Sequence, residues 1–159
     1  MIYATAFFAT SSAAQSPSVT WNRVTDQHET SIEVPVSVLT PRADPDGLAF
    51  DAEKGAVRIR LLTLTEHRPG FPGNDPKGDM NLKRSDCTAW PPSYYALKDR
   101  LAAYSCIRNS KVTYYLARYA PSGSARLYVE YPVAESRFWD AVVKRMTASL
   151  QQVGRQEVR

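Results

Sequence analysis

The chain has 159 residues, a length typical of one domain with a single hydrophobic core. Apolar residues make up 43% of it and charged residues 23%, which is typical of a globular protein and excludes an intrinsically disordered chain. The net charge of +4 comes from 20 basic and 16 acidic residues. The basic residues are scattered along the chain, which argues against nucleic acid binding.

The N-terminal segment 1–14 is apolar and rich in small residues, and it predicts the remnant of a signal peptide. Ser12 and Ala14 suit a signal-peptidase site, with cleavage before Gln15. No Lys or Arg precedes the apolar stretch, so a cytosolic protein with a flexible or strand-forming N-terminus is the alternative. We favour a periplasmic or secreted protein. No segment has the ~20 apolar residues of a transmembrane helix.

Alternation of apolar and polar residues predicts β-strands in the first half of a single domain at residues 17–151. A first strand is predicted in 18–26 and a second in 30–40, which should end or lie at a sheet edge near Pro35. The stretch 41–47 contains two prolines and an Asp-Gly pair, and it predicts a loop.

A short strand, a turn and a long strand are predicted in 48–65. In the long strand, Arg58 and Arg60 share one face. The opposite face carries the apolar residues Val57, Ile59 and Leu61. This pattern indicates a sheet with one covered face and one wetter face.

Residues 66–92 contain prolines and glycines spaced too closely for a helix or a long strand, so we predict a long loop that is either functional or mobile. Cys87 lies in this loop and Cys106 follows it. Their spacing fits neither a redox pair nor a zinc site, and in an exported chain they most simply form a disulfide worth about 3 kcal/mol. The alternative is two buried thiols in a cytosolic protein. A short helical turn is predicted in 93–101.

A tyrosine-rich meander of three strands is predicted in 102–132, with turns at Asn109–Lys111 and Pro121–Ser124. Pro132 ends its last strand. An amphipathic helix with Ser136 as its N-cap follows in 133–150, and residues 152–159 should fray. The apolar stripe of this helix comprises Trp139, Val142, Val143, Met146 and Leu150. We therefore expect an α+β fold in which a C-terminal helix covers an antiparallel sheet of about six or seven strands.

Short motifs mark the start, turns and end of the domain: Trp21 after a proline, Val34-Pro35, Asp46-Gly47, Tyr131-Pro132 and Ser149-Leu150. In this order they resemble a group of exported proteobacterial domains with a PsbP/Mog1-like fold, and the resemblance spans about Pro17 to Gln151. The proline-rich stretch 70–78 departs from the pattern, where a helix would be usual. The resemblance implies an α/β/α sandwich that serves as a binding or assembly module and has no shared active site.

Few side chains indicate catalytic chemistry. His28 and His67 are the only histidines, and both lie in predicted loops, where a lone histidine is usually solvated. Asp75 and Asp79 lack the spacing of a calcium loop. No cofactor or metal motif is present in the sequence, so we expect neither group to be bound.

The expected contact surface, for a protein or small-molecule partner, is formed by Arg58, Arg60, Trp90 and His67. Arg118, Arg126 and exposed tyrosines would extend it, whereas a merely solvated face and a core position for Trp90 are the alternatives. We place Trp21 and Trp139 in the core.

Three functional hypotheses follow from the sequence. The leading one is an exported, non-enzymatic binding or accessory module. The second is a hydrolase-type enzyme whose site lies in the loop 66–92, with His67 and either Asp75 or Asp79. The third is a subunit or scaffold that pairs through an exposed strand edge.

Overall fold

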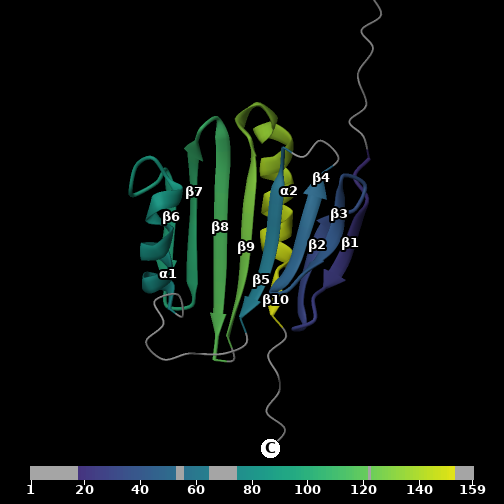
Figure 1. Cartoon of the computed structure of the whole chain (residues 1–159), viewed down its shortest axis with the longest axis horizontal. Helices are drawn as coiled ribbons and strands as arrows, with labels where there is room; N and C mark the ends of the chain where they lie inside the picture. Colours follow the sequence, from purple (N-terminus) through teal and green to yellow (C-terminus); the bar gives the residue numbers. More distant parts are fainter. Residues whose placement is uncertain (1–17, 53–55, 65–74, 122, 153–159) are drawn as a thin grey trace, which may run out of the picture.

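A computed structural model describes residues 18–52, 56–64, 75–121 and 123–152. This part of the chain forms one α+β domain with a large antiparallel sheet, a small sheet and two α-helices (Figure 1). The predicted signal remnant, His67 and most of the predicted frayed tail lie outside the described residues. The expected fold class is confirmed.

The large sheet has seven strands. In spatial order they are β3 (Leu39–Asp44), β4 (Gly47–Ala52), β5 (Arg58–Leu64), β9 (Gly123–Pro132), β8 (Lys111–Ala120), β7 (Leu101–Arg108) and β6 (Tyr94–Lys98). The small sheet consists of β1 (Trp21–Thr25), β2 (Thr30–Pro35) and the short β10 (Gln151–Gln152). The helical segments are α1 (Pro76–Leu82), the 3-10 turns η1 (Lys83–Asp86) and η2 (Val133–Glu135), and α2 (Ser136–Ser149).

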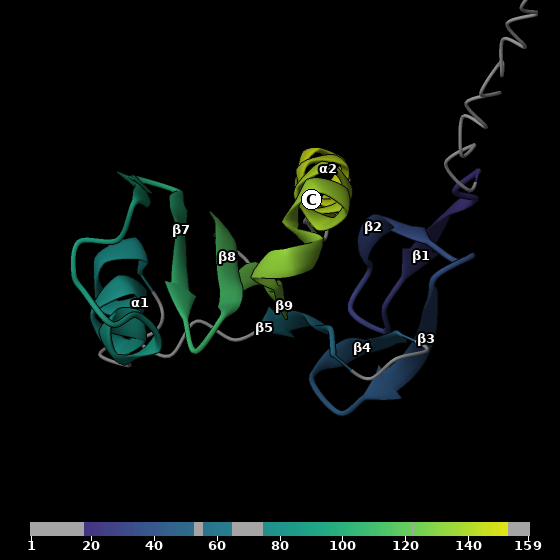
Figure 2. The same ribbon diagram turned by 90° about the horizontal axis from the view of Figure 1, so that it is seen from above.

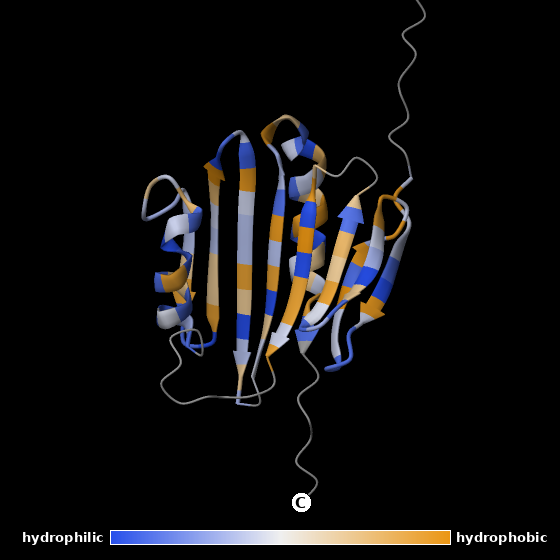
Figure 3. Ribbon diagram, in the orientation of Figure 1, coloured by the Kyte–Doolittle hydropathy of each residue, from blue (hydrophilic) through white to orange (hydrophobic). Residues whose placement is uncertain are grey.

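The two faces of the large sheet are covered by different elements (Figure 2). The α2 face carries apolar side chains such as Ile59 and Leu127, and both α2 and the small sheet lie on it. The α1 face carries Arg60 and its neighbour Tyr128, and α1 covers it only over β6, β7 and β8. Figure 3 shows the underlying alternation of hydrophobic and hydrophilic residues along β5 and β9.

The C-terminal helix packs as its periodicity predicts. All five residues of its apolar stripe are at least nine-tenths buried, and they join the core formed with β2, β5 and β9. The predicted N-cap is wrong, because Ser136 is the first helical residue and Glu135 occupies the cap position. The Glu135 carboxylate makes no capping bond and instead accepts a hydrogen bond from the Trp139 indole nitrogen at 2.9 Å.

Three other local predictions are wrong. Residues 76–86 of the predicted loop are helical, because Asp75 caps the Gly78 amide at 2.8 Å and Met80 is buried against the sheet. The stretch 93–101 contains strand β6 rather than a helical turn. The stretch 41–47 continues as β3 to Asp44 before it turns, since the whole strand pairs with β4.

Candidate ligand-binding face

Four tyrosines lie side by side across the α1 face of the large sheet. Tyr95, Tyr104, Tyr115 and Tyr128 come from β6, β7, β8 and β9, and each is paired in register with the next. We call them the tyrosine row, and Arg60 of β5 extends it because Arg60 pairs with Tyr128. The rings of Tyr104 and Tyr115 stack with centroids 5.5 Å apart. These four of the tyrosines that recur in the sequence therefore form one aromatic strip on the α1 face, whereas Tyr114 and Tyr131 pack on the α2 face.

A buried carboxylate holds α1 over the middle of this row. Asp79 is only 1% exposed, and its Oδ2 accepts hydrogen bonds from the hydroxyl groups of Tyr115 and Tyr119. The Arg126 Nε lies 3.6 Å from the same oxygen and offsets the buried charge. Burial, followed by the nearby Asp79 charge, raises the pKa of Tyr115, so this hydroxyl is a neutral donor at physiological pH. Asp79 thus anchors α1 to β8 and β9.

The carboxylates of the hydrolase hypothesis both have structural contacts. The Asp75 side chain caps the first turn of α1, and the Asp79 side chain is engaged by two tyrosines. His67, the third member of that hypothesis, lies outside the described residues.

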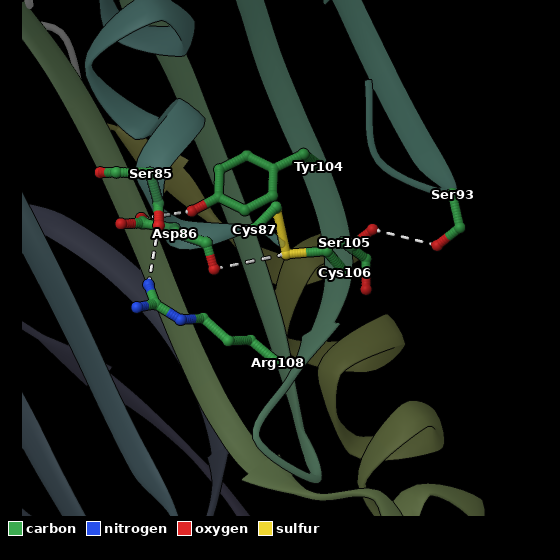
Figure 4. The surroundings of a disulfide bond; sticks show 8 residues. All are labelled: Ser85, Asp86, Cys87, Ser93, Tyr104, Ser105, Cys106 and Arg108. Carbon is green, nitrogen blue, oxygen red and sulfur yellow. Dashed lines mark hydrogen bonds between the residues drawn. A yellow bond between two sulfur atoms is a disulfide. The ribbon is translucent and has the colours of Figure 1, made fainter. Parts of the chain in front are cut away.

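Cys87 and Cys106 lie at disulfide-bonding distance, with sulfur atoms 2.11 Å apart and Cα atoms 5.8 Å apart (Figure 4). The pair links the end of η1 to β7. Two hydrogen bonds support the same junction: the Tyr104 hydroxyl donates to Asp86 Oδ2 at 2.6 Å, and Arg108 donates to the Ser85 carbonyl at 2.7 Å. Figure 4 shows these contacts grouped around the sulfur atoms. The η1 turn is therefore fixed on the α1 face.

A groove of about 240 Å³ lies beside this junction, where η1 meets the strands. It is lined by Asp86, Arg108, Asn109, Lys111, Thr113, Tyr128 and Glu130. Its floor comes from β8 and β9, and its ends come from η1 and the turn between β7 and β8. The groove is thus a polar hollow at the boundary between the part of the face that α1 and η1 cover and the part they leave open.

The charged groups of the groove already have partners within the protein. The Lys111 ammonium lies 2.7 Å from Glu130 Oε1, and Asp86 accepts the Tyr104 hydroxyl. The Lys83 ammonium lies 5.9 Å from the ring centroid of Tyr128, within the range of a cation–π contact. Burial, followed by the Glu130 charge, raises the pKa of Tyr128. Tyr128 therefore presents a neutral hydroxyl and an aromatic face.

The two predicted arginines of β5 lie on the same face and border this groove. Arg58 pairs in register with Glu130, and Arg60 pairs with Tyr128, so both are next to residues that line the groove. The Arg60 guanidinium also contacts Asp44 at 2.8 Å. This hydrogen bond, followed by one from the Asp46 amide, lowers the pKa of Asp44. The open part of the face is therefore rich in charge.

The structure separates the other predicted contact residues. Trp90 lies at the far end of the tyrosine row, where it packs edge-on against Tyr95 and Tyr104 and is half-buried. Arg118 lies on the α2 face and donates to the Thr147 carbonyl of α2. Arg126 belongs to the Asp79 cluster, and His28 lies in the turn before β2. Only Arg58 and Arg60 border the groove.

Most residues that line the groove were missed at the sequence level. The strands of Arg108, Lys111, Thr113, Tyr128 and Glu130 were predicted, but not the register that brings their side chains together. The signal was present in the two predicted turns, because a tight turn fixes the pairing of the strands that it joins. Asp86 gave no such signal, since it lies in a stretch that was predicted as loop.

Within the described ranges, no three His, Cys, Asp or Glu side chains gather as a set that could hold a metal ion. No helix in this part of the chain has the length and apolar character needed to cross a membrane. No protein-family model and no curated protein matches the chain.

Proposed function

We propose that this chain is an exported, non-enzymatic binding or accessory module, and that its groove on the α1 face binds a small ligand with an anionic group. The groove is the observation that carries the proposal. It combines a polar hollow with the flat ring of Tyr128, and a few fixed polar groups beside an aromatic surface are typical of ligand sites. The resemblance to PsbP/Mog1-like domains favours the same class of protein.

The charge around the groove favours an anion. The charged residues that line the groove are balanced, with Arg108 and Lys111 against Asp86 and Glu130. Arg58 and Lys83 add positive charge beside it, since Arg58 pairs with Glu130 and the Lys83 ammonium lies near the Tyr128 ring. Both carboxylates are already engaged, Asp86 by Tyr104 and Glu130 by Lys111. A ligand carboxylate or phosphate would therefore complete the charge balance of the site.

Export is supported by two features. Segment 1–14 has the small residues of a signal-peptidase site, and Cys87 and Cys106 lie at bonding distance on the α1 face. Disulfides persist mainly in oxidising compartments, so both features favour the periplasm or secretion.

Binding is tested by NMR titration of the isotope-labelled chain with inorganic phosphate and with citrate, and sodium chloride serves as the control for ionic strength. We expect amide shifts confined to residues around the groove. Arg58→Gln should weaken binding about three- to tenfold, since it removes one charged contact. Arg42→Gln is the matched control, because Arg42 lies on the same face but contacts Asp51 at 3.1 Å. Equal weakening by both variants, or equal shifts with chloride, would contradict the proposal.

Export is tested by expressing the full chain in a Gram-negative host and measuring the mass of the protein from the periplasmic extract. We expect a chain that begins at Gln15 and gains two hydrogen masses on reduction. An uncleaved chain that stays in the cytosol would contradict export but not ligand binding.

A further inference from the structure

Among the strands that the structure describes, β6 is the last of the large sheet and has no further strand paired to it. Its side chains Tyr94, Tyr95 and Leu97 are 48%, 40% and 39% exposed, although they are large and apolar. The opposite edge strand, β3, carries a proline and charged residues that discourage further pairing. Strand β6 has neither a proline nor a charge before Lys98. An exposed apolar edge of this kind is a template for another strand.

The hairpin geometry shows which backbone groups of β6 point outward. Lys98 and Leu101 close a hairpin with two residues in its loop, so they form a hydrogen-bonded pair between β6 and β7. Hydrogen-bonded and non-hydrogen-bonded pairs alternate along an antiparallel ladder. Tyr94 and Ala96 therefore also bond to β7, whereas the amide and carbonyl groups of Tyr95 and Leu97 point away from the sheet.

We propose that β6 pairs with β6 of a second copy of this chain, antiparallel and with the two Ala96 residues opposite each other. In this register Tyr95 of one copy lies opposite Leu97 of the other, and their outward amides and carbonyls form reciprocal hydrogen bonds. Lys98 lies opposite Tyr94, which allows a cation–π contact and keeps the two lysines apart. The Tyr95–Leu97 and Tyr94–Lys98 pairs are favourable and the Ala96 pair is neutral, so the strand is complementary to itself.

This pairing goes beyond ligand binding, but it is compatible with it. The two-fold axis would be perpendicular to the sheet, so the α1 faces of both copies would lie on the same side. The two tyrosine rows would then meet end to end through Tyr95 and Leu97, and the two grooves would face the same way. A five-residue strand pairing is smaller than a standard stable interface, so we expect a weak dimer.

Cross-linking tests the register. Residues opposite each other in a non-hydrogen-bonded pair have Cα atoms about 4.5 Å apart, which a disulfide can span. Ala96→Cys should therefore give a covalent dimer under mild oxidation, visible on a non-reducing gel. Lys98→Cys is the matched control, because the Cα atoms of the two introduced cysteines would be about 14 Å apart. Equal cross-linking of both variants, or none with Ala96→Cys, would overturn the register.

Sedimentation equilibrium of the full chain at up to about 200 μM tests the dimer itself. Leu97→Pro removes an outward amide without breaking the ladder to β7, and it should weaken the dimer about tenfold. Phe138→Lys is the control, because Phe138 is an exposed apolar residue of α2 and does not belong to the sheet. A monomer at the highest concentration would refute the proposal, as would a Leu97→Pro dimer as tight as the original. Leu97→Lys serves as a second variant if Leu97→Pro does not fold.

Discussion

At the scale of single residues, Asp79 shows how a buried charge can hold an element in place. Its carboxylate is removed from water, yet two tyrosine hydroxyls and one guanidinium surround it. Breaking a buried cluster of this kind by changing one member is strongly destabilising, because the remaining groups keep their desolvation cost.

We predict that Asp79→Asn lowers the free energy of unfolding by about 2–3 kcal/mol, because the amide cannot accept both hydroxyls with the strength of a carboxylate. Urea denaturation measures the change. Asp51→Asn is the control, since Asp51 forms an exposed pair with Arg42 that should contribute less than about 1 kcal/mol. Equal effects of the two substitutions would refute an anchoring role for Asp79.

Gly47 is a second residue with a specific structural role, because the neighbouring backbone leaves no room for a side chain. A Cβ atom at this position would lie 2.1 Å from the Leu61 carbonyl oxygen, and the backbone φ is +156°. We predict that Gly47→Ala destabilises the protein by about 2–4 kcal/mol, because backbone rather than a flexible side chain must move. Thermal unfolding checks this. Gly78→Ala, inside α1, should be neutral or slightly stabilising, and a similar loss there would remove the steric explanation.

At the scale of elements, how well each could be predicted depends on where its stability comes from. Helix α2 could be predicted because its 14 residues are enough to show a helical period in the apolar positions. The residues that show this period are the ones that pack into the core. Helix α1 was missed because it has seven residues, including a proline and a glycine. It depends on the Asp75 cap, on Met80 and on the Asp79 cluster, and these tertiary contacts leave no periodic signal.

The same distinction holds for the candidate site, where features of a single segment could be predicted and contacts between segments could not. Strand alternation placed Arg58 and Arg60 on one face, since that inference needs only one strand. The groove needs the register between β8 and β9, together with the position of η1, and no single segment carries that information. Strand β6 was missed because it is a short edge strand. It pairs only with β7, so the amide and carbonyl groups of alternate residues point away from the sheet.

Helix α2 provides the first test at this scale. We predict that Met146→Ala lowers the free energy of unfolding by about 3 kcal/mol, because Met146 is fully buried between α2 and the sheets. Phe138→Ala on the same helix should cost far less, since Phe138 is 37% exposed. Guanidinium denaturation of both variants measures the difference. Comparable losses would mean that α2 does not cover the sheet through its apolar stripe.

The link between η1 and β7 provides the second test. We predict that replacing both Cys87 and Cys106 by Ser destabilises the protein by about 3 kcal/mol, because the unfolded chain gains freedom. Hydrogen exchange should accelerate most in residues 76–86, where the link holds η1 and the adjacent α1 on the sheet. Amides of β5 and β9, which exchange through global unfolding, should accelerate only as far as the free energy of unfolding falls. No additional acceleration in residues 76–86 would contradict a local role of the link.

At the scale of the whole molecule, buried tyrosines make the fold sensitive to alkali. Burial is the first cause that raises the pKa of Tyr104, Tyr115 and Tyr131, and it raises the pKa of Tyr114 to about 12. In the unfolded chain these hydroxyls ionise near pH 10. Between pH 10 and 12 the folded state therefore holds more protons than the unfolded state.

We predict that stability is fully present below about pH 10 and falls as the pH rises through that value and beyond. Each buried tyrosine that stays neutral only in the folded state contributes a slope of about 1.4 kcal/mol per pH unit. Urea denaturation between about pH 8 and 11.5 measures this, and near-ultraviolet tyrosinate absorbance shows which state is ionised. A flat profile would mean that these hydroxyls are accessible to solvent.

The small sheet joins the two ends of the domain. Strand β2 pairs with β1 on one side and with β10 on the other, so Ser31 contacts both Thr25 and Gln151. Arg23 of β1 also reaches the Ser149 carbonyl at 3.4 Å, and Arg145 of α2 lies over the Trp21 ring. The ribosome synthesises β1 and β2 well before α2 and β10, so these contacts cannot form until the C-terminal part of the domain has been made. The small sheet of this domain therefore cannot be completed until α2 and β10 have been synthesised, and deleting the final turn of α2 would remove the Ser149 carbonyl that Arg23 contacts.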